Sequence, residues 1–318
     1  MSASKLPPFE YYEPATVAEA TEHLAAHGDN ARVLAGGVDL LPRMRAGSVK
    51  AGHLINIQLV AGLDYLRRAS GAPAAAGAGT GIEFGAMANL RSLERWDGLK
   101  AGYRALYDAM HQITSVQTKY MGTAVGNLCV ASPASDVAPA LAAYDAILLI
   151  SGPDGDRKLA VGDFYPAYGQ TALGRGELVT GVQVPPLPAG FGAAFFNLVR
   201  THADIAKVTV TAAVVLENGV CTQARIALGS VAPTMFRALE AEALLEGKEL
   251  SDELIRAAAA AAAGKTHPID DLRSTARYRK ATAEVLVGRA LHKAAERARA
   301  SAAKPGSDRG PSGEGVAG

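Results

Sequence analysis

The chain contains the stretch Val33-Leu34-Ala35-Gly36-Gly37-Val38-Asp39-Leu40, in which a short strand runs straight into two glycines. Because glycine has no Cβ, the backbone N–H groups of such a turn can come close to a bound anion. Residues 39–44 can open a helix, and the positive end of a helix adds to that attraction. Taken alone, a strand followed by Gly-Gly is more often only a turn, so a second signal is needed.

Strand and helix signals alternate around this turn. Thr16 and Glu19 form a capping box that begins a helix, and Gly28 ends it. The other elements expected in this half are strands at 32–34, 53–57, 81–85 and 146–150, and helices at 89–95 and 99–112. The alternation predicts an α/β arrangement up to about residue 180.

The pattern changes after Pro185-Pro186-Leu187-Pro188. Three strands and then three helices are expected, and Asn218-Gly219 between the second and third strands is a strong hairpin signal. The strands are expected at 191–199, 207–216 and 220–228, and the helices at 234–245, 251–263 and 277–300. Strands followed by helices predict a separate α+β domain. From Ser301 onward the chain is rich in Gly, Ser and Pro, which predicts a disordered tail.

Composition excludes several kinds of protein. The 318 residues are expected to form two domains, and the net charge of +1 gives no field that would attract nucleic acid or an anionic membrane. Only Cys129 and Cys221 occur, too few for a disulfide scaffold or for the ligands of an iron–sulfur cluster. Residues 1–14 lack the apolar core of a secretory signal, and the longest apolar run, 255–263, is too short to cross a bilayer. A cytoplasmic protein without a membrane span is therefore expected.

A second unusual segment is Gly122-Thr123-Ala124-Val125-Gly126-Asn127-Leu128, followed by Ala131-Ser132-Pro133-Ala134-Ser135-Asp136. It is a long stretch of small residues that holds a single charge, at Asp136. Small residues with hydroxyl groups suit a wall that lies flat against an extended ligand. An irregular loop packed on the core would have the same composition, so this segment alone does not decide between the two.

Together, the two segments resemble the paired FAD-binding signatures of one flavoprotein family. This family comprises the flavoprotein subunits and domains of xanthine dehydrogenase, carbon monoxide dehydrogenase and 4-hydroxybenzoyl-CoA reductase. Its AGGTDLL turn holds the FAD pyrophosphate and its GTIGGNL…ASPxxD segment lines the flavin, and residues 35–41 and 122–136 match them. The resemblance continues, in the family's order, through Asp204-Ile205-Ala206-Lys207-Val208, 225–233, 270–273 and Tyr278-Arg279. It covers Phe9 to about Lys293, and residues 204–208 look like the xanthine dehydrogenase loop beside the flavin ring.

Some positions depart from the family pattern. Val125 replaces the first glycine of a Gly-Gly pair, and Val38 stands where threonine is common. Lys119 and Tyr120 stand for an Arg-Asn pair, and Asn197 lies near the position of a frequent lysine. The chain also lacks the cysteine-rich insertion of the 4-hydroxybenzoyl-CoA reductase subunit.

The resemblance implies an α+β protein with a vanillyl-alcohol-oxidase-type (PCMH-type) FAD-binding domain. This domain is expected at 1–182 as two α/β subdomains with the cofactor between them. A C-terminal domain at 189–300 is expected to contain a three-stranded antiparallel sheet and helices, and the tail occupies 301–318. The cofactor-binding residues that the resemblance implies are Leu34, Ala35, Gly36, Gly37, Val38, Asp39, Lys119, Thr123, Gly126, Asn127, Ser132, Asp136, Val179, Asp204, Ile205 and Lys207.

The family's mechanism implies an electron-transfer subunit with FAD, with no catalytic acid or base and no metal on this chain. A large subunit with molybdopterin would hydroxylate the substrate, and a small subunit with two [2Fe–2S] clusters would pass electrons to the FAD. Reduced flavin would deliver them to NAD⁺, a quinone or another acceptor. The three subunits are expected to assemble as a dimer of heterotrimers.

Other interpretations remain open at this point. The chain could be a stand-alone flavin oxidoreductase of the same fold, or a scaffold subunit that has lost FAD. A dinucleotide loop at 77–81 is disfavoured, because Ile82 stands where the third glycine belongs. His23 and His27 on one helix could bind a metal, but no third ligand lies near them, which favours a solvated face. The basic helix at 277–300 is an outer surface or a docking face for an acidic partner.

Overall fold

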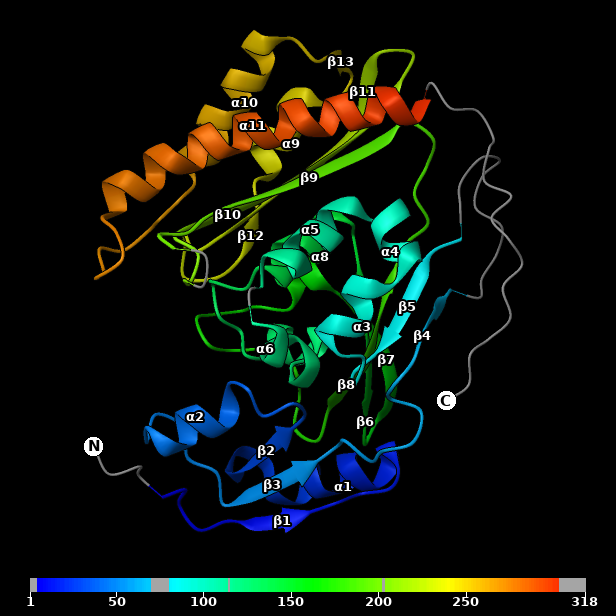
Figure 1. The fold of residues 1–318 in the computed structure, drawn as a ribbon, viewed down its shortest axis with the longest axis vertical. Helices are drawn as coiled ribbons and strands as arrows, with labels where there is room; N and C mark the ends of the chain where they lie inside the picture. Colours follow the sequence, from blue (N-terminus) through cyan, green and yellow to red (C-terminus); the bar gives the residue numbers. More distant parts are fainter. Residues whose placement is uncertain (1–4, 70–79, 114, 202–203, 303–318) are drawn as a thin grey trace.

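The computed structural model describes residues 5–69, 80–113, 115–201 and 204–302. Three sheets, each accompanied by helices, follow one another along the chain (Figure 1). Most of the sequence that suggested a dinucleotide loop (77–79) and most of the predicted tail (303–318) lie outside the described residues.

The N-terminal sheet is small and parallel. It has the strand order β1-β3-β2, with β1 at Glu10–Tyr12, β2 at Ala31–Leu34 and β3 at His53–Asn56. Thr16 is confirmed as the N-cap of helix α1 (Val17–His27), because its hydroxyl accepts the Glu19 N–H, and Gly28 follows the last turn. The Glu19 side chain reaches back one residue further than a capping box requires and accepts the Ala15 N–H at 2.7 Å. The parallel β2–β3 pair brings the end of β2 and the following helix α2 (Leu40–Arg45) to one edge of this layer.

The second sheet is antiparallel throughout. Its order is β4 (Leu66–Arg68), β5 (Ile82–Gly85), β8 (Leu178–Val184), β6 (Ile147–Gly152) and β7 (Gly155–Ala160). The strands predicted at 81–85 and 146–150 are confirmed. Only the first of the two expected α/β subdomains therefore has a parallel sheet. The reason is that β6 and β7 form a hairpin, which reverses the chain instead of crossing over.

Six helices lie along the chain between β5 and β6: α3 (Leu90–Arg95), α4 (Asp97–Gly102), α5 (Arg104–Gln112), α6 (Val116–Met121), α7 (Ala124–Cys129) and α8 (Val137–Ala143). The single helix predicted at 99–112 is wrong. It breaks at Tyr103, whose backbone leaves the helical region and whose hydroxyl donates to the Pro185 carbonyl at 2.8 Å. Segment 122–136, for which either a flat wall beside a ligand or an irregular loop was expected, contains α7.

The C-terminal sheet contains the three predicted strands, β9 (Phe191–Leu198), β10 (Val208–Glu217) and β11 (Val220–Gly229). The hairpin at Asn218-Gly219 is confirmed, with both residues at positive φ. Two short strands, β12 (Phe236–Arg237) and β13 (Lys248–Glu249), also pair with β11, so the sheet has five strands rather than three. Because Phe236 and Arg237 pair with β11, the helix expected from 234 begins later, as α9 (Leu239–Leu245).

The C-terminal sheet lies between two layers of helices. Helix α11 (Ala276–Ala302) runs along one face together with α9 and α10 (Asp252–Gly264), and α5 and α8 face the other side (Figure 1). Ion pairs also join the sheet to the preceding part of the chain. Asp145 binds Arg225 at 2.8 Å and Arg237 at 2.9 Å. These ion pairs tie β11 and β12 to the turn that follows α8.

Candidate functional site

The turn after β2 offers free hydrogen-bond donors. Gly37 has φ +67°, a conformation that glycine adopts without strain. The Ala35 carbonyl accepts a hydrogen bond from Gln58 Nε2 at 2.7 Å, which holds the start of the turn. Within the described parts of the chain, the backbone N–H groups of residues 36–39 donate to no protein acceptor. The turn therefore presents a row of donors, as an anion site requires.

The two unusual segments meet at Gly36. A Cβ added to Gly36 would lie 1.7 Å from the carbonyl oxygen of Met121 and 2.5 Å from its carbonyl carbon. A Cβ added to Gly122 would lie 3.8 Å from Cγ2 of Val38. The turn and the start of segment 122–136 are thus in close backbone contact although they lie far apart in the sequence. Glycine is required at 36 because the end of α6 occupies the place of a side chain.

The small polar residues of segment 122–136 stabilise the conformation of this segment through their own hydrogen bonds. Thr123 caps α7 by accepting the Gly126 N–H at 2.9 Å, and the Ser132 hydroxyl accepts the Ala134 N–H at 3.2 Å. The Ser135 hydroxyl donates to the side-chain oxygen of Asn127. A hydroxyl that accepts one bond can still donate its own proton. Ser132, which is partly exposed, therefore keeps a donor for a ligand, whereas Thr123 is buried and only stabilises the conformation of the segment.

Asp136 connects segment 122–136 to the C-terminal sheet. Its carboxylate accepts hydrogen bonds from Asn197 Nδ2 and Thr209 Oγ1, each at 3.4 Å. Asn197 and Thr209 are paired across β9 and β10. Burial raises the pKa of Asp136 to about 6, although the two hydrogen bonds act in the opposite direction. The carboxyl is thus held at the end of the β9–β10 hairpin.

The loop of that hairpin carries the third group of expected site residues. The Lys207 N–H donates to the Leu198 carbonyl at 2.7 Å and closes the loop directly beyond the pair that holds Asp136. The Asp204 carboxylate accepts the Ile205 N–H at 2.9 Å. The side chain of Ile205 is 50% exposed. Ile205 is therefore an exposed apolar side chain in the loop next to the residue pair that holds Asp136.

Comparison with known proteins agrees with this arrangement. Residues 7–187 match the family model described as the FAD binding domain in molybdopterin dehydrogenase, and residues 193–294 match the CO dehydrogenase flavoprotein C-terminal domain. The chain belongs to the family of FAD-binding subunits of the molybdenum hydroxylases. The expected family, fold class and FAD cofactor are confirmed.

Several relatives match this FAD-binding subunit along nearly their whole length. The carbon monoxide dehydrogenase medium chain of Afipia carboxidovorans is 32% identical, over 92% of this chain and 98% of that protein. The glyceraldehyde dehydrogenase medium chain of Sulfolobus acidocaldarius is 29% identical, over 91% of this chain and 99% of that protein. Among solved structures, a carbon monoxide dehydrogenase chain from Hydrogenophaga pseudoflava superimposes with a TM-score of 0.86. It is 33% identical, and the match covers 92% of this chain and 99% of that one.

Two of the expected site residues of the FAD-binding subunit lie elsewhere. The ammonium of Lys119 donates to Glu94 Oε1 at 2.8 Å and to the His111 carbonyl at 3.1 Å, and only 6% of the side chain is exposed. Val179 is buried in β8 and pairs with Ile150. Neither side chain faces the surface formed by the turn, segment 122–136 and the hairpin loop. The structure therefore does not support a direct ligand contact by these two side chains.

The departures from the family pattern have structural explanations. The side chain of Val125 is buried in the hydrophobic core, so the extra methyl groups do not face the ligand side. Val38 is exposed, beside Gly122. Asn197, near the position of a frequent lysine, donates to Asp136. The valines thus leave the contact between the two segments intact.

Sequence reasoning missed two contributors to the site. Met121 acts through its carbonyl oxygen, and no side-chain pattern predicts a backbone contact of that kind. Thr209 acts through its hydroxyl, and here a signal exists. It is one of two fully buried threonines, with Thr211, in a largely apolar strand. Most buried hydroxyls have a hydrogen-bond partner, and the partner of Thr209 is Asp136.

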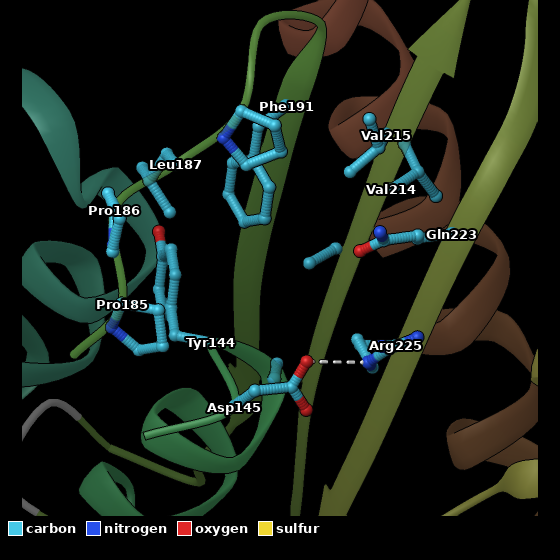
Figure 2. Close-up of a pocket in the computed structure, with 13 residues that line it drawn as sticks. Tyr144, Asp145, Pro185, Pro186, Leu187, Phe191, Val214, Val215, Gln223 and Arg225 are labelled. Atoms are coloured by element: carbon cyan, nitrogen blue, oxygen red, sulfur yellow. Dashed lines mark hydrogen bonds and ion pairs between the residues drawn. The ribbon is translucent and has the colours of Figure 1, made fainter. Parts of the chain in front are cut away.

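A pocket of about 120 Å³ lies apart from this site. Figure 2 shows it between Tyr144 and Asp145, the segment 185–188 with Phe191, and strands β10 and β11. Its polar end is the ion pair of Asp145 with Arg225. None of the sixteen expected cofactor residues lines it. The pocket marks the junction of the two halves of the chain rather than the cofactor site.

The two histidines of the candidate metal pair, His23 and His27, pack against other aromatic rings. His27 stacks on His53 with a centroid distance of 3.7 Å, and His23 packs on Tyr12 at 4.4 Å. No group of three or more potential metal ligands is present in the described part of the chain. Among its helices, none combines the length and the apolar character needed to cross a membrane.

We predict that Ile205→Tyr slows reoxidation of the bound flavin by about threefold to tenfold, because an aromatic ring covers more of a neighbouring ring than isoleucine does. The measurement is stopped-flow reoxidation together with the visible spectrum of the flavin. Leu239→Tyr is the control, since Leu239 is also exposed but begins α9. Equal spectra and reoxidation rates for Ile205→Tyr and the wild type would show that this loop does not lie beside the flavin.

Proposed function

We propose that this chain binds one FAD non-covalently and transfers electrons within a three-subunit molybdenum hydroxylase. Electrons would come from the [2Fe–2S] clusters of a small subunit and leave to an external acceptor. A large subunit with molybdopterin would carry out the substrate chemistry. The observation that carries the proposal is the backbone contact between the Gly36 turn and Met121, which joins both family signatures beside a row of free N–H groups.

The residues present fit FAD. The free N–H groups of residues 36–39 can hold the pyrophosphate, because negative oxygens accept such bonds strongly. Segment 122–136 supplies small residues and the spare hydroxyl donor of Ser132 along an extended ligand. Asp136 and the loop 204–207 lie at the far end of that segment, which suits the flavin ring. When bound, FAD supplies the ability to take up and release electrons one or two at a time.

The chain's own residues bind and orient the cofactor. The conformation of Gly37 and the packing of Gly36 keep the turn ready for the anion before it binds. Asp136 is held by two neutral donors beside the proposed flavin position, and burial raises its pKa to about 6 although these two hydrogen bonds lower it. Cys129 and Cys221 lie on different elements, α7 and β11, and are too few to hold a cluster. Electrons from substrate would therefore have to cross an interface.

The proposed assembly follows from the relatives. Several of them are named as medium chains, and one is named as subunit alpha of the 6-hydroxypseudooxynicotine dehydrogenase complex of Paenarthrobacter nicotinovorans. We propose the domain division 1–182 and 189–300, because the two antiparallel sheets lie on either side of residues 185–188. A dimer of heterotrimers and a cytoplasmic location stay predictions.

We predict that the purified chain carries about one FAD but hydroxylates no substrate, whereas the co-expressed three-subunit complex does. Acid precipitation followed by absorbance measures the FAD, and both samples are assayed with the same N-heterocycles, aldehydes and aromatic thioesters. Robust turnover by the single chain, at the rate of the complex, would favour a stand-alone flavin oxidoreductase. A colourless chain that cannot be reconstituted with FAD would favour a scaffold without cofactor.

A further inference from the structure

A buried arginine ties together three segments of the C-terminal half. Arg279 lies in the first turns of α11 and is only 4% exposed. Its guanidinium donates to the Lys207 carbonyl at 2.8 Å, to the Ser230 carbonyl at 3.1 Å and to Asp271 Oδ1 at 2.8 Å. Arginines are almost never fully buried unless paired. These three bonds compensate for the burial of the guanidinium, whose Nε has no partner among the described residues.

Two of these segments lead directly to the candidate cofactor site. Lys207 is the last residue of the hairpin loop that contains Asp204 and Ile205. Ser230 donates its backbone N–H to the carbonyl of Pro133 at 2.6 Å, and Pro133 belongs to segment 122–136. The Arg279 guanidinium therefore binds the hairpin loop at Lys207 and also binds Ser230, which in turn bonds segment 122–136. A shift of Arg279 would move the hairpin loop relative to segment 122–136.

The third segment contains Asp271, which orients the guanidinium of Arg279. The Asp271 carboxylate also accepts the backbone N–H groups of Arg273 at 2.8 Å and Ser274 at 3.0 Å. Burial raises the pKa of Asp271, but these bonds and Arg279 lower it more, to about 2. The carboxylate is thus charged at neutral pH. A planar fork can reach two carbonyls and a carboxylate at once, whereas the ammonium of a lysine is a point donor on a flexible stem.

We propose that Arg279 is a positioning residue for the flavin. By holding Lys207 and Ser230, it fixes the loop 204–207 against segment 122–136 and so sets how far the flavin ring is open to solvent and to the external acceptor. This inference rests on the proposed placement of FAD. A purely structural arginine would stabilise the C-terminal half without affecting the surroundings of the flavin.

The test compares Arg279→Met and Arg279→Lys in the full chain loaded with FAD. We expect Arg279→Met to keep its FAD, because the pyrophosphate turn is untouched. Loss of two charge-assisted bonds raises the population of the open loop by about tenfold or more. Iodide quenching of flavin fluorescence should then increase and the visible circular dichroism of the flavin should change. Arg279→Lys should lie between Arg279→Met and the wild type.

The control is Arg277→Met, an exposed position two residues earlier on α11, which should leave both signals unchanged. If Arg279→Met does not fold, Asp271→Asn decides, because it weakens the orientation of the guanidinium and should shift both signals in the same direction. A folded Arg279→Met with wild-type quenching and circular dichroism would overturn the proposal, as would an unchanged Asp271→Asn if Arg279→Met does not fold. Failure of the proposed function looks different, because the wild type itself would then hold no FAD.

Discussion

Gly37→Val is expected to purify folded but largely without flavin, with an affinity for FAD about 100-fold lower than that of the wild type. Gly37 has φ +67°, and the atoms nearest to a Cβ there would belong to the side chains of Leu41, at 3.0 Å, and Leu34, at 3.2 Å. These side chains can shift, so the fold survives. The backbone relaxes away from positive φ, however, and the row of N–H groups loses its alignment. The flavin content and the dissociation constant of FAD measure the effect.

A matched control separates backbone strain from loss of the site. Gly47 has φ +72° just after α2, and a Cβ there would meet nothing within 4 Å. Gly47→Val thus introduces a similar strain, on the order of 1–2 kcal/mol, outside the turn. We expect it to lose stability but to keep its flavin. Normal flavin content in Gly37→Val would place the pyrophosphate elsewhere.

Gly36 should be less tolerant than Gly37. Its missing Cβ would lie 1.7 Å from the Met121 carbonyl oxygen, and backbone cannot move aside as a side-chain end can. Even Gly36→Ala should therefore separate the two signature segments and lower both stability and flavin content. The comparison of the two glycines distinguishes a residue needed for conformation from one needed for close packing.

Lys119→Met is expected to lower the free energy of unfolding by about 3 kcal/mol, because removing one partner leaves a buried charge without full compensation. Glu94 is buried and accepts hydrogen bonds from Lys119 and Arg91 and contacts His111. Lys119→Arg should retain most of the stability, since a guanidinium can also bind the carboxylate. The matched control is the exposed pair of Lys293 with Glu296, where Lys293→Met should cost less than about 1 kcal/mol. Chemical denaturation followed by circular dichroism measures both.

The ion pair of Glu94 with Lys119 also predicts that the stability of the folded chain depends on pH. Burial raises the pKa of Glu94, but its hydrogen bonds to Lys119, Arg91 and His111 lower it more, from 4.5 to about 2. A carboxyl with a lowered pKa in the folded state contributes stability that is fully present above pH 4.5 and is lost as the pH falls towards 2. Lys119→Met should raise the folded pKa and shrink this loss. A wild type and a Lys119→Met variant with the same acid profile would contradict the assignment.

Helix boundaries and hairpins followed from local signals in the sequence. Thr16 caps its helix and Asn218-Gly219 turns its hairpin because a few neighbouring backbone groups decide such features. Where distant strands compete, local signals failed. The helix expected from 234 begins at Leu239 because residues 236–237 pair with β11, and the helix at 99–112 breaks where Tyr103 bonds Pro185.

The sequence by itself determined the family, the cofactor and the order of the segments that form the candidate site, because the motifs are read along the chain. Only the tertiary structure decided what each residue does in them. Gly36 is explained by the carbonyl of Met121, and Val125 proves harmless because it faces the core. Lys119, which resembles a ligand contact, instead neutralises the buried Glu94. The physical reason is that burial, close packing and charge pairing depend on groups brought together from distant parts of the chain, and spacing along the sequence does not record them.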